Sequence, residues 1–164
     1  MTKNVLHDLA KQLGGLLMRR HLRCAVAESC TGGGLSVAIT DIPGSSQWFD
    51  RGLVTYSNQA KTELLGVSAD LIEEHGAVSE AVVLAMAAGV IERSHAEVSA
   101  SISGIAGPDG GTSEKPVGTV WIGFARTGQS AQAYRYVFQG DREAIRQQAV
   151  TCALEGLIHF LLIE

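Results

Sequence analysis

The sequence contains few aromatic residues, cysteines and prolines, and it carries only a small net charge. Aromatic residues make up 5% of its 164 residues, and it has three cysteines, three prolines and a formal net charge of −4. Cys24, Cys30 and Cys152 form no C-x-x-C pair, and an odd number of cysteines at irregular spacing does not indicate a disulfide framework. The acidic balance argues against a dedicated nucleic-acid binder, although a local basic pocket for one phosphate remains compatible with it.

Long hydrophobic runs are also missing. The first ten residues mix acidic and basic side chains with isolated Val and Leu, so no signal peptide is indicated. Every apolar stretch is interrupted before the roughly 18 residues that a membrane span needs. We therefore expect one cytoplasmic domain over residues 1–164, without membrane contact.

Instead, the sequence alternates between helical and strand patterns. Apolar residues at spacings of three and four predict a first helix, with a stripe of Val5, Leu9, Leu13, Leu16 and Leu17. Further helices are expected after the glycines at 32–34, from a cap at Asn58, from Ser79 and over 141–162.

Short apolar runs between these helices predict five strands, at 23–27, 49–56, 98–105, 117–125 and 133–138. The spacing of the last two favours an antiparallel hairpin. The alternation predicts an α/β fold, a three-layer α/β/α sandwich around a mixed, mostly parallel sheet of about five strands.

The segment Ala-Glu-Ser-Cys-Thr-Gly-Gly (27–33) carries the first candidate chemistry. It places Ser29 between a strand and a helix N-terminus, where free N–H groups can stabilise a phosphate or an oxyanion. The simpler alternative is that Ser29 or Thr31 only caps the helix. The glycines at 32–34 weigh against it, because glycine is expected where something must approach the backbone.

A nucleophilic serine needs a base, and the segment 55–61 offers two candidates. Tyr56 ends a strand and Lys61 lies one turn into the next helix, so both can face the carboxyl edge of the sheet. Taken alone, Lys61 is more simply an exposed helix lysine and Tyr56 a core or rim aromatic. Cys30 can also be reactive at a helix N-terminus, but we rank it below Ser29.

A Gly-rich loop and one arginine complete the candidate site. The loop over 103–111 can cradle an anion or a carbonyl group with its amides, or be a plain surface turn. Arg142 lies in the first turn of the last helix, where the helix dipole disfavours a positive charge. This placement suggests that the guanidinium faces a phosphate or a carboxylate. Glu28 or Asp109 is the structural alternative for its partner.

Metal and cofactor chemistry receive no support. The five histidines are scattered without zinc-ligand spacing, and no Gly-Lys-Ser/Thr follows the glycines, so neither a metal site nor ATP hydrolysis is expected.

Together these segments, with His-Gly-Ala-Val-Ser (75–79), Lys-Pro-Val-Gly-Thr-Val (115–120) and Gly-Asp-Arg (140–142), resemble the CinA C-terminal-domain family over essentially the whole chain. Its stand-alone nicotinamide-nucleotide amidohydrolases are the most similar members. The resemblance implies hydrolysis of nicotinamide mononucleotide (NMN) to nicotinate mononucleotide and ammonia in pyridine-nucleotide salvage. It implies a metal-free homodimer with a related α/β/α fold.

The resemblance also implies roles for individual residues. Ser29 is expected to be the nucleophile and Lys61 its base, assisted by Tyr56. Oxyanion and phosphate contacts are expected from two loops and one arginine: Cys30, Thr31, Gly32, Gly33, Ser103, Gly104, Ile105, Ala106, Gly107 and Arg142. Two alternatives stay open: a catalytically silent module that binds a pyridine nucleotide or ADP-ribose, and an interaction protein linked to competence or DNA damage.

Overall fold

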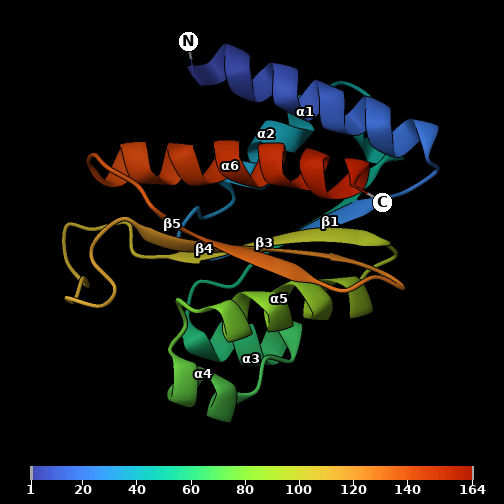
Figure 1. Cartoon of the computed structure of the whole chain (residues 1–164). Coiled ribbons are helices and arrows are strands. Elements are labelled where there is room, and N and C mark those ends of the chain that lie inside the picture. Colours follow the sequence, from blue (N-terminus) through green and yellow to red (C-terminus); the bar gives the residue numbers. More distant parts are fainter. Residues whose placement is uncertain (1, 164) are drawn as a thin grey trace.

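The computed structural model describes residues 2–163, which form a five-stranded sheet with helices on both faces (Figure 1). The strands are β1 (Cys24–Glu28), β2 (Phe49–Val54), β3 (Val98–Gly104), β4 (Thr119–Arg126) and β5 (Gln132–Val137). Their order is β2-β1-β3-β4-β5. β1 pairs with β2 and β3 in parallel, and β4 is antiparallel to both β3 and β5, so the predicted mixed sheet is confirmed.

Two groups of helices cover the sheet. One face carries α1 (Thr2–Arg19), α2 (Gly34–Thr40) and α6 (Arg142–Leu162), and the other carries α3 (Asn58–Leu65), α4 (Ala69–His75) and α5 (Glu80–Glu92) (Figure 1). A short 3₁₀ helix, Ser45–Gln47, precedes β2. The predicted α/β/α arrangement is thus confirmed, with α1 packed mainly on α6 and α2.

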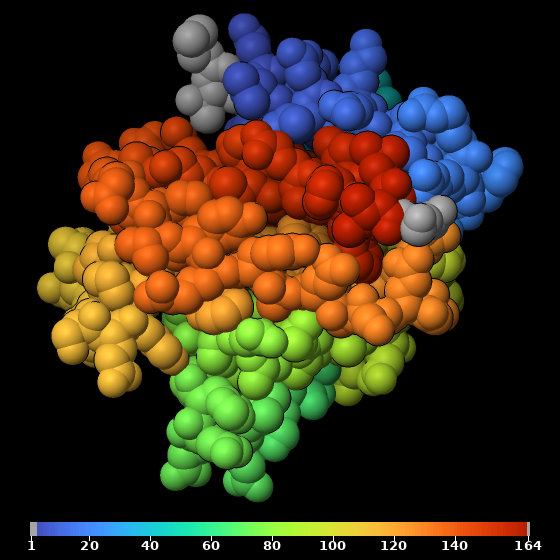
Figure 2. All heavy atoms as spheres, in the orientation of Figure 1, coloured from blue at the N-terminus to red at the C-terminus, as the bar shows by residue number. Residues whose placement is uncertain are grey.

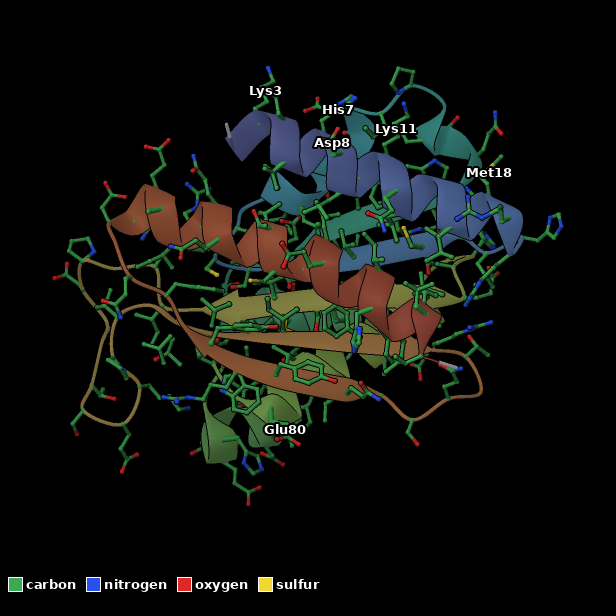
Figure 3. The ribbon with its side chains drawn as sticks, turned by 45° about the horizontal axis from the view of Figure 1, so that its top comes forward. Lys3, His7, Asp8, Lys11, Met18 and Glu80 are labelled. Atoms are coloured by element: carbon green, nitrogen blue, oxygen red, sulfur yellow. The ribbon has the colours of Figure 1, made fainter. Side chains whose placement is uncertain are left out.

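Helix α1 shows how periodicity determines burial. Leu13 and Leu17 are fully buried, whereas Lys3, His7 and Lys11 lie on the exposed face (Figure 3). Val5 was expected in the buried stripe, and this was wrong: 48% of it is exposed, because it lies near the end of α1.

The parallel strands determine where a site can form. Each strand of the group β2-β1-β3 ends at the same edge of the sheet, and buried residues fill most of β1 and β3. In such sheets, ligands bind outside the carboxyl ends of the strands. The segments after β1, β2 and β3 therefore meet at one place, and these are the segments that carry the predicted site residues.

Two further findings concern membranes and cysteines. None of the helices described here is long and apolar enough to cross a membrane. All three cysteines are free thiols.

Candidate active site

Ser29 lies in the first turn after β1 and contacts residues of both neighbouring strand ends, those of β2 and β3. Its N–H donates to the carbonyl of Ile102 on β3 at 3.0 Å, and its hydroxyl lies 3.3 Å from the Tyr56 carbonyl beyond β2. Only 7% of the residue is exposed. The strands therefore hold Ser29 in place from both sides and leave its Oγ at the edge of the sheet.

Lys61 is a buried amine aimed at this hydroxyl. Its Nζ lies 3.1 Å from Ser29 Oγ, and it also donates to the carbonyls of Thr55 at 3.0 Å and Tyr56 at 3.2 Å. The side chain is 1% exposed, and no carboxylate pairs with it within residues 2–163. Burial lowers the pKa of Lys61 from its ordinary value of 10.5, because it penalises the charged form.

Helix α3 sets the position of this lysine. Its N-cap is Ser57, whose hydroxyl accepts from the Ala60 N–H at 3.0 Å; the expected cap, Asn58, is instead the first helical residue. The correction has a simple cause, since Ser57 retains the extended backbone that a cap requires. Lys61 then falls one turn into the helix and reaches back across the end of β2.

Glu28 organises the turn that carries Ser29. Its carboxylate is fully buried, and one oxygen accepts from Thr31 Oγ1 at 2.6 Å and Leu35 N–H at 2.9 Å. The other oxygen accepts from Ser36 N–H at 2.9 Å and Ser36 Oγ at 2.7 Å. The Glu28 side chain thus accepts hydrogen bonds from the free N–H groups in the first turn of α2, which is the role of a helix cap. Neither Ser29 nor Thr31 therefore has the simple capping role considered above.

Close packing supports this cap. Gly32 and Gly33 have φ values of 58° and 102°, which L side chains rarely adopt, so the turn itself needs these glycines. A Cβ on Gly52 of β2 would lie 2.1 Å from Ser36 Oγ, so glycine there leaves room for the serine that binds Glu28.

Cys30 is next to Ser29, but its thiol is not in the reactive thiolate form. Burial raises the pKa of its thiol to about 11, so the thiol is protonated at neutral pH. Of the two side chains, the Ser29 hydroxyl is the one with the Lys61 amine within hydrogen-bonding distance.

A cavity of about 210 Å³ opens in front of Ser29. It is lined by Ser29, Cys30, Tyr56, Asn58, Lys61, Ala77, Val78, Ser103, Gly104, Ala106 and Arg142. The structure therefore brings together the ends of all three parallel strands, the loop before α5 and the start of α6. Residues 2–163 contain no cluster of His, Cys, Asp or Glu able to hold a metal ion.

Known proteins are similar to this chain in sequence and in fold. The model of the CinA C-terminal domain matches residues 6–161. A nicotinamide-nucleotide amidohydrolase PncC from Enterobacter agglomerans is 54% identical over 155 residues, covering 94% of each chain. A protein of the same name from Escherichia coli K12 is 51% identical over 157 residues, covering 96% of this chain and 95% of that one.

Solved structures agree with the sequence comparison. The competence/damage inducible protein of Agrobacterium tumefaciens superposes with a TM-score of 0.92 at 39% identity, covering 94% of both chains. The competence damage-inducible protein A of Klebsiella pneumoniae superposes with a TM-score of 0.92 at 37% identity, covering 96% of this chain and 98% of that one. This chain belongs to the CinA C-terminal domain family. The predicted resemblance is confirmed.

Within this CinA domain, the residues expected to bind substrate fall into two groups. The cavity is lined by Cys30, Ser103, Gly104, Ala106 and Arg142. The others do not line it: Thr31, Gly32, Gly33, Ile105 and Gly107.

Several of the non-lining residues have structural partners instead. The Thr31 hydroxyl is bound to Glu28, Ile105 pairs with Thr119 and Gly118 through its backbone, and the Gly107 carbonyl accepts from Arg142 at 2.8 Å.

Arg142 does not meet the carboxylates considered as its partners. Its guanidinium donates to the Gly107 carbonyl and to the Tyr56 hydroxyl, the latter at 3.2 Å, and not to Glu28 or Asp109. In residues 2–163, no hydrogen bond joins the Tyr56 phenol to Ser29 or Lys61. Tyr56 instead contributes its carbonyl to the lysine, and it is one of the residues that line the cavity.

Sequence reasoning did not identify four features of this site. Asn58, Ala77 and Val78 line the cavity, and Arg146 contacts the serine turn from α6. The sequence does hold a signal for Arg146, because it lies four residues after Arg142 and so on the same face of the helix.

Proposed function

We propose that this chain is a nicotinamide-nucleotide amidohydrolase that converts NMN into nicotinate mononucleotide and ammonia. The observation that carries the proposal is the buried Lys61 amine, which has no counter-ion among residues 2–163 and lies 3.1 Å from Ser29 Oγ. The names of the relatives supply the class of substrate. The geometry supplies a serine and a base, which is what hydrolysis of an unactivated amide requires.

The hydrogen bonds of Lys61 suit a neutral amine. A neutral amine has two N–H donors and one lone pair, and two carbonyls, of Thr55 and Tyr56, lie within reach of the donors. The Ser29 hydroxyl, which lies within reach of both Lys61 Nζ and the Tyr56 carbonyl, then turns its proton from that carbonyl toward the lone pair of Lys61. The lowered pKa of Lys61 favours this neutral state.

Each proton then has a place in the reaction. Ser29 Oγ attacks the carboxamide carbon while Lys61 takes its proton, and the resulting ammonium returns that proton to the departing nitrogen, which leaves as ammonia. Lys61 next deprotonates a water molecule, which attacks the Ser29 ester. Serine regains its proton from Lys61 as the acid product leaves.

The serine turn also offers donors for the oxyanion. In residues 2–163, two N–H groups directly after Ser29 have no hydrogen-bond partner: that of Cys30, which lines the cavity, and that of Thr31, the next residue, which is not among the lining residues. Two adjacent amides of this kind stabilise the charge that develops on the carbonyl oxygen, and each is typically worth about 3 kcal/mol of barrier.

The cavity suggests how the substrate lies. Its volume of about 210 Å³ is below the roughly 300 Å³ at which whole-ligand pockets begin, so it suits the nicotinamide ring with the rest of the nucleotide outside. Ser103 Oγ, unpartnered among the described residues, can bind the carboxamide. Arg142 at the rim suits the phosphate, and the Tyr56 ring positions the substrate between them.

An ammonia-release assay tests the proposal. Wild-type protein is expected to release ammonia from NMN and to act poorly on nicotinamide, nicotinamide riboside and NAD, because only NMN presents one terminal phosphate to Arg142. Binding of NMN without ammonia release would instead establish a silent nucleotide-binding module. If the protein neither binds NMN nor releases ammonia from it, but does bind a competence-linked partner protein, the result would favour the interaction protein.

We further propose that the enzyme works as a cytoplasmic homodimer in pyridine-nucleotide salvage. β5 is an edge strand on which Tyr134 and Val137 are each 43% exposed. Beside it, two hollows of about 440 and 290 Å³ share Cys152 and Glu155 of α6, and β5 and α6 run across the face seen in Figure 2. Such a surface suits a second copy. Sedimentation velocity would give the mass of a dimer or, against the proposal, of a monomer.

A further inference from the structure

Arg146 joins α6 to the turn that carries the nucleophile. Its Nε donates to the Cys30 carbonyl at 3.0 Å and its Nη2 to the Thr31 carbonyl at 3.3 Å. The same Nη2 would lie 3.3 Å from a Cβ built on Gly32, so the guanidinium packs directly on the turn backbone. Its fork thus spans two consecutive carbonyls and does not line the cavity.

These contacts determine the direction of the amides. A trans peptide is planar, and its C=O and N–H point in opposite directions. Because Arg146 draws the Cys30 carbonyl toward α6, the Thr31 N–H of the same peptide points away from α6. This N–H is one of the two unpartnered donors that follow Ser29.

The peptide held in this way lies at the centre of a β-turn. The Gly32 N–H donates to the Ser29 carbonyl at 3.0 Å, so Cys30 and Thr31 are the central residues of a β-turn. Rotation of the peptide between the central residues is what distinguishes type I from type II turns. Thr31 does not have a positive φ, which disfavours the flipped form, and Arg146 holds the same peptide from its carbonyl side.

We infer that Arg146 is a positioning residue for the proposed amidase, which fixes the peptide between Cys30 and Thr31 so that the Thr31 N–H serves the oxyanion. The inference rests on the proposed function, because it assigns this N–H to the reaction of Ser29. Arginine suits the task better than lysine, since a planar fork reaches two carbonyls and an ammonium group acts as a single point.

Labelling of Ser29 by a small sulfonyl fluoride tests this without any nucleotide. Ser29 Oγ forms a bond to sulfur, fluoride leaves, the serine proton passes to Lys61, and negative charge develops on the sulfonyl oxygens. Arg146→Met is expected to slow the labelling about tenfold or more, and Arg146→Lys to slow it less, because one carbonyl stays held.

Gln147→Met is the matched control, since Gln147 is an exposed neighbour on α6 whose side chain, among residues 2–163, bonds only to Glu143. It is expected to label at the wild-type rate. The inference is overturned if Arg146→Met labels within twofold of wild type, if Gln147→Met is slowed equally, or if wild-type Ser29 does not react. If Arg146→Met fails to fold, Arg146→Lys decides by the same twofold criterion.

NMN kinetics separate this inference from the proposed function. In Arg146→Met, kcat is expected to fall about 100-fold while KM stays within about threefold, because the donor acts mainly in the transition state. A wild-type enzyme that labels in an Arg146-dependent manner but releases no ammonia from NMN would overturn the proposed function alone. A rise in KM with unchanged kcat would overturn the positioning role alone.

Discussion

The surroundings of Glu28 and Lys61 differ sharply, although both ionisable side chains are buried and lie next to Ser29. Each oxygen of Glu28 accepts two hydrogen bonds from the groups that begin α2. Lys61 has no carboxylate partner in residues 2–163 and contacts two carbonyls and the serine hydroxyl. Full satisfaction of a buried charge indicates a structural role, whereas a buried amine without a counter-ion is free to exchange a proton.

Replacing Lys61 should give the largest effect. In Lys61→Met, NMN deamidation is expected to fall at least about 1000-fold, because no base accepts the Ser29 proton. The unfolding free energy at pH 7 should not fall, because the change removes the cost of burying an amine. Ammonia release and thermal unfolding measure the two quantities. Loss of folding together with activity would show that Lys61 is structural, like Glu28.

Replacing Glu28 should give the opposite result. Glu28→Ala leaves four donors without this acceptor, two of them buried and the two of Ser36 partly buried, so the unfolding free energy is expected to fall by about 3 kcal/mol. The isosteric Glu28→Gln keeps one acceptor oxygen and should lose less. Urea unfolding measures both variants. If Glu28→Ala is as stable as wild type, the cap does not hold the turn.

The pH dependence should follow Lys61. Because burial lowers the pKa of Lys61 below 10.5, kcat/KM should rise about tenfold per pH unit and level off at that lowered pKa. The direction follows from the base being active when neutral. A pH–rate profile measures the break. A break near 11, the pKa of the Cys30 thiol, would assign the titration to the neighbouring cysteine.

The smallest effect is expected at the edge of the Glu28 network. Ser36→Ala removes one of its four donors, so the unfolding free energy should fall by about 1 kcal/mol. Deamidation should stay within about twofold of wild type, because Ser36 does not line the cavity. A tenfold loss of deamidation activity would show that the Glu28 network affects catalysis directly, which contradicts the purely structural role that the comparison with Lys61 gives to Glu28.

Most elements of the fold were predictable because they depend on local pattern, although helix α4 (Ala69–His75) was not among the predicted helices. Alternating apolar runs marked all five strands, and their spacing gave the β4–β5 hairpin. Errors occurred where tertiary position overrides pattern: Val5 has a core-like spacing, but it lies at an end of α1 where little covers it.

The site was only partly predictable, for a related reason. Ser29 and Lys61 could be paired because each follows a parallel strand, and the carboxyl ends of such strands meet. Arg146 and, in two of its four hydrogen bonds, Glu28 are bound to backbone groups, which carry no residue identity. Arg146 contacts carbonyls more than 100 residues away in the sequence, and nothing in a residue type marks such a bond.

The central claim is that Ser29, and not its neighbour Cys30, attacks the carboxamide. Ammonia release from NMN by Ser29→Ala and Cys30→Ala, measured side by side, tests it most directly. We expect Ser29→Ala to lose at least about 1000-fold in kcat/KM and Cys30→Ala to stay within about tenfold, since its protonated thiol takes no part in the attack. Retained activity in a folded Ser29→Ala protein would contradict the account.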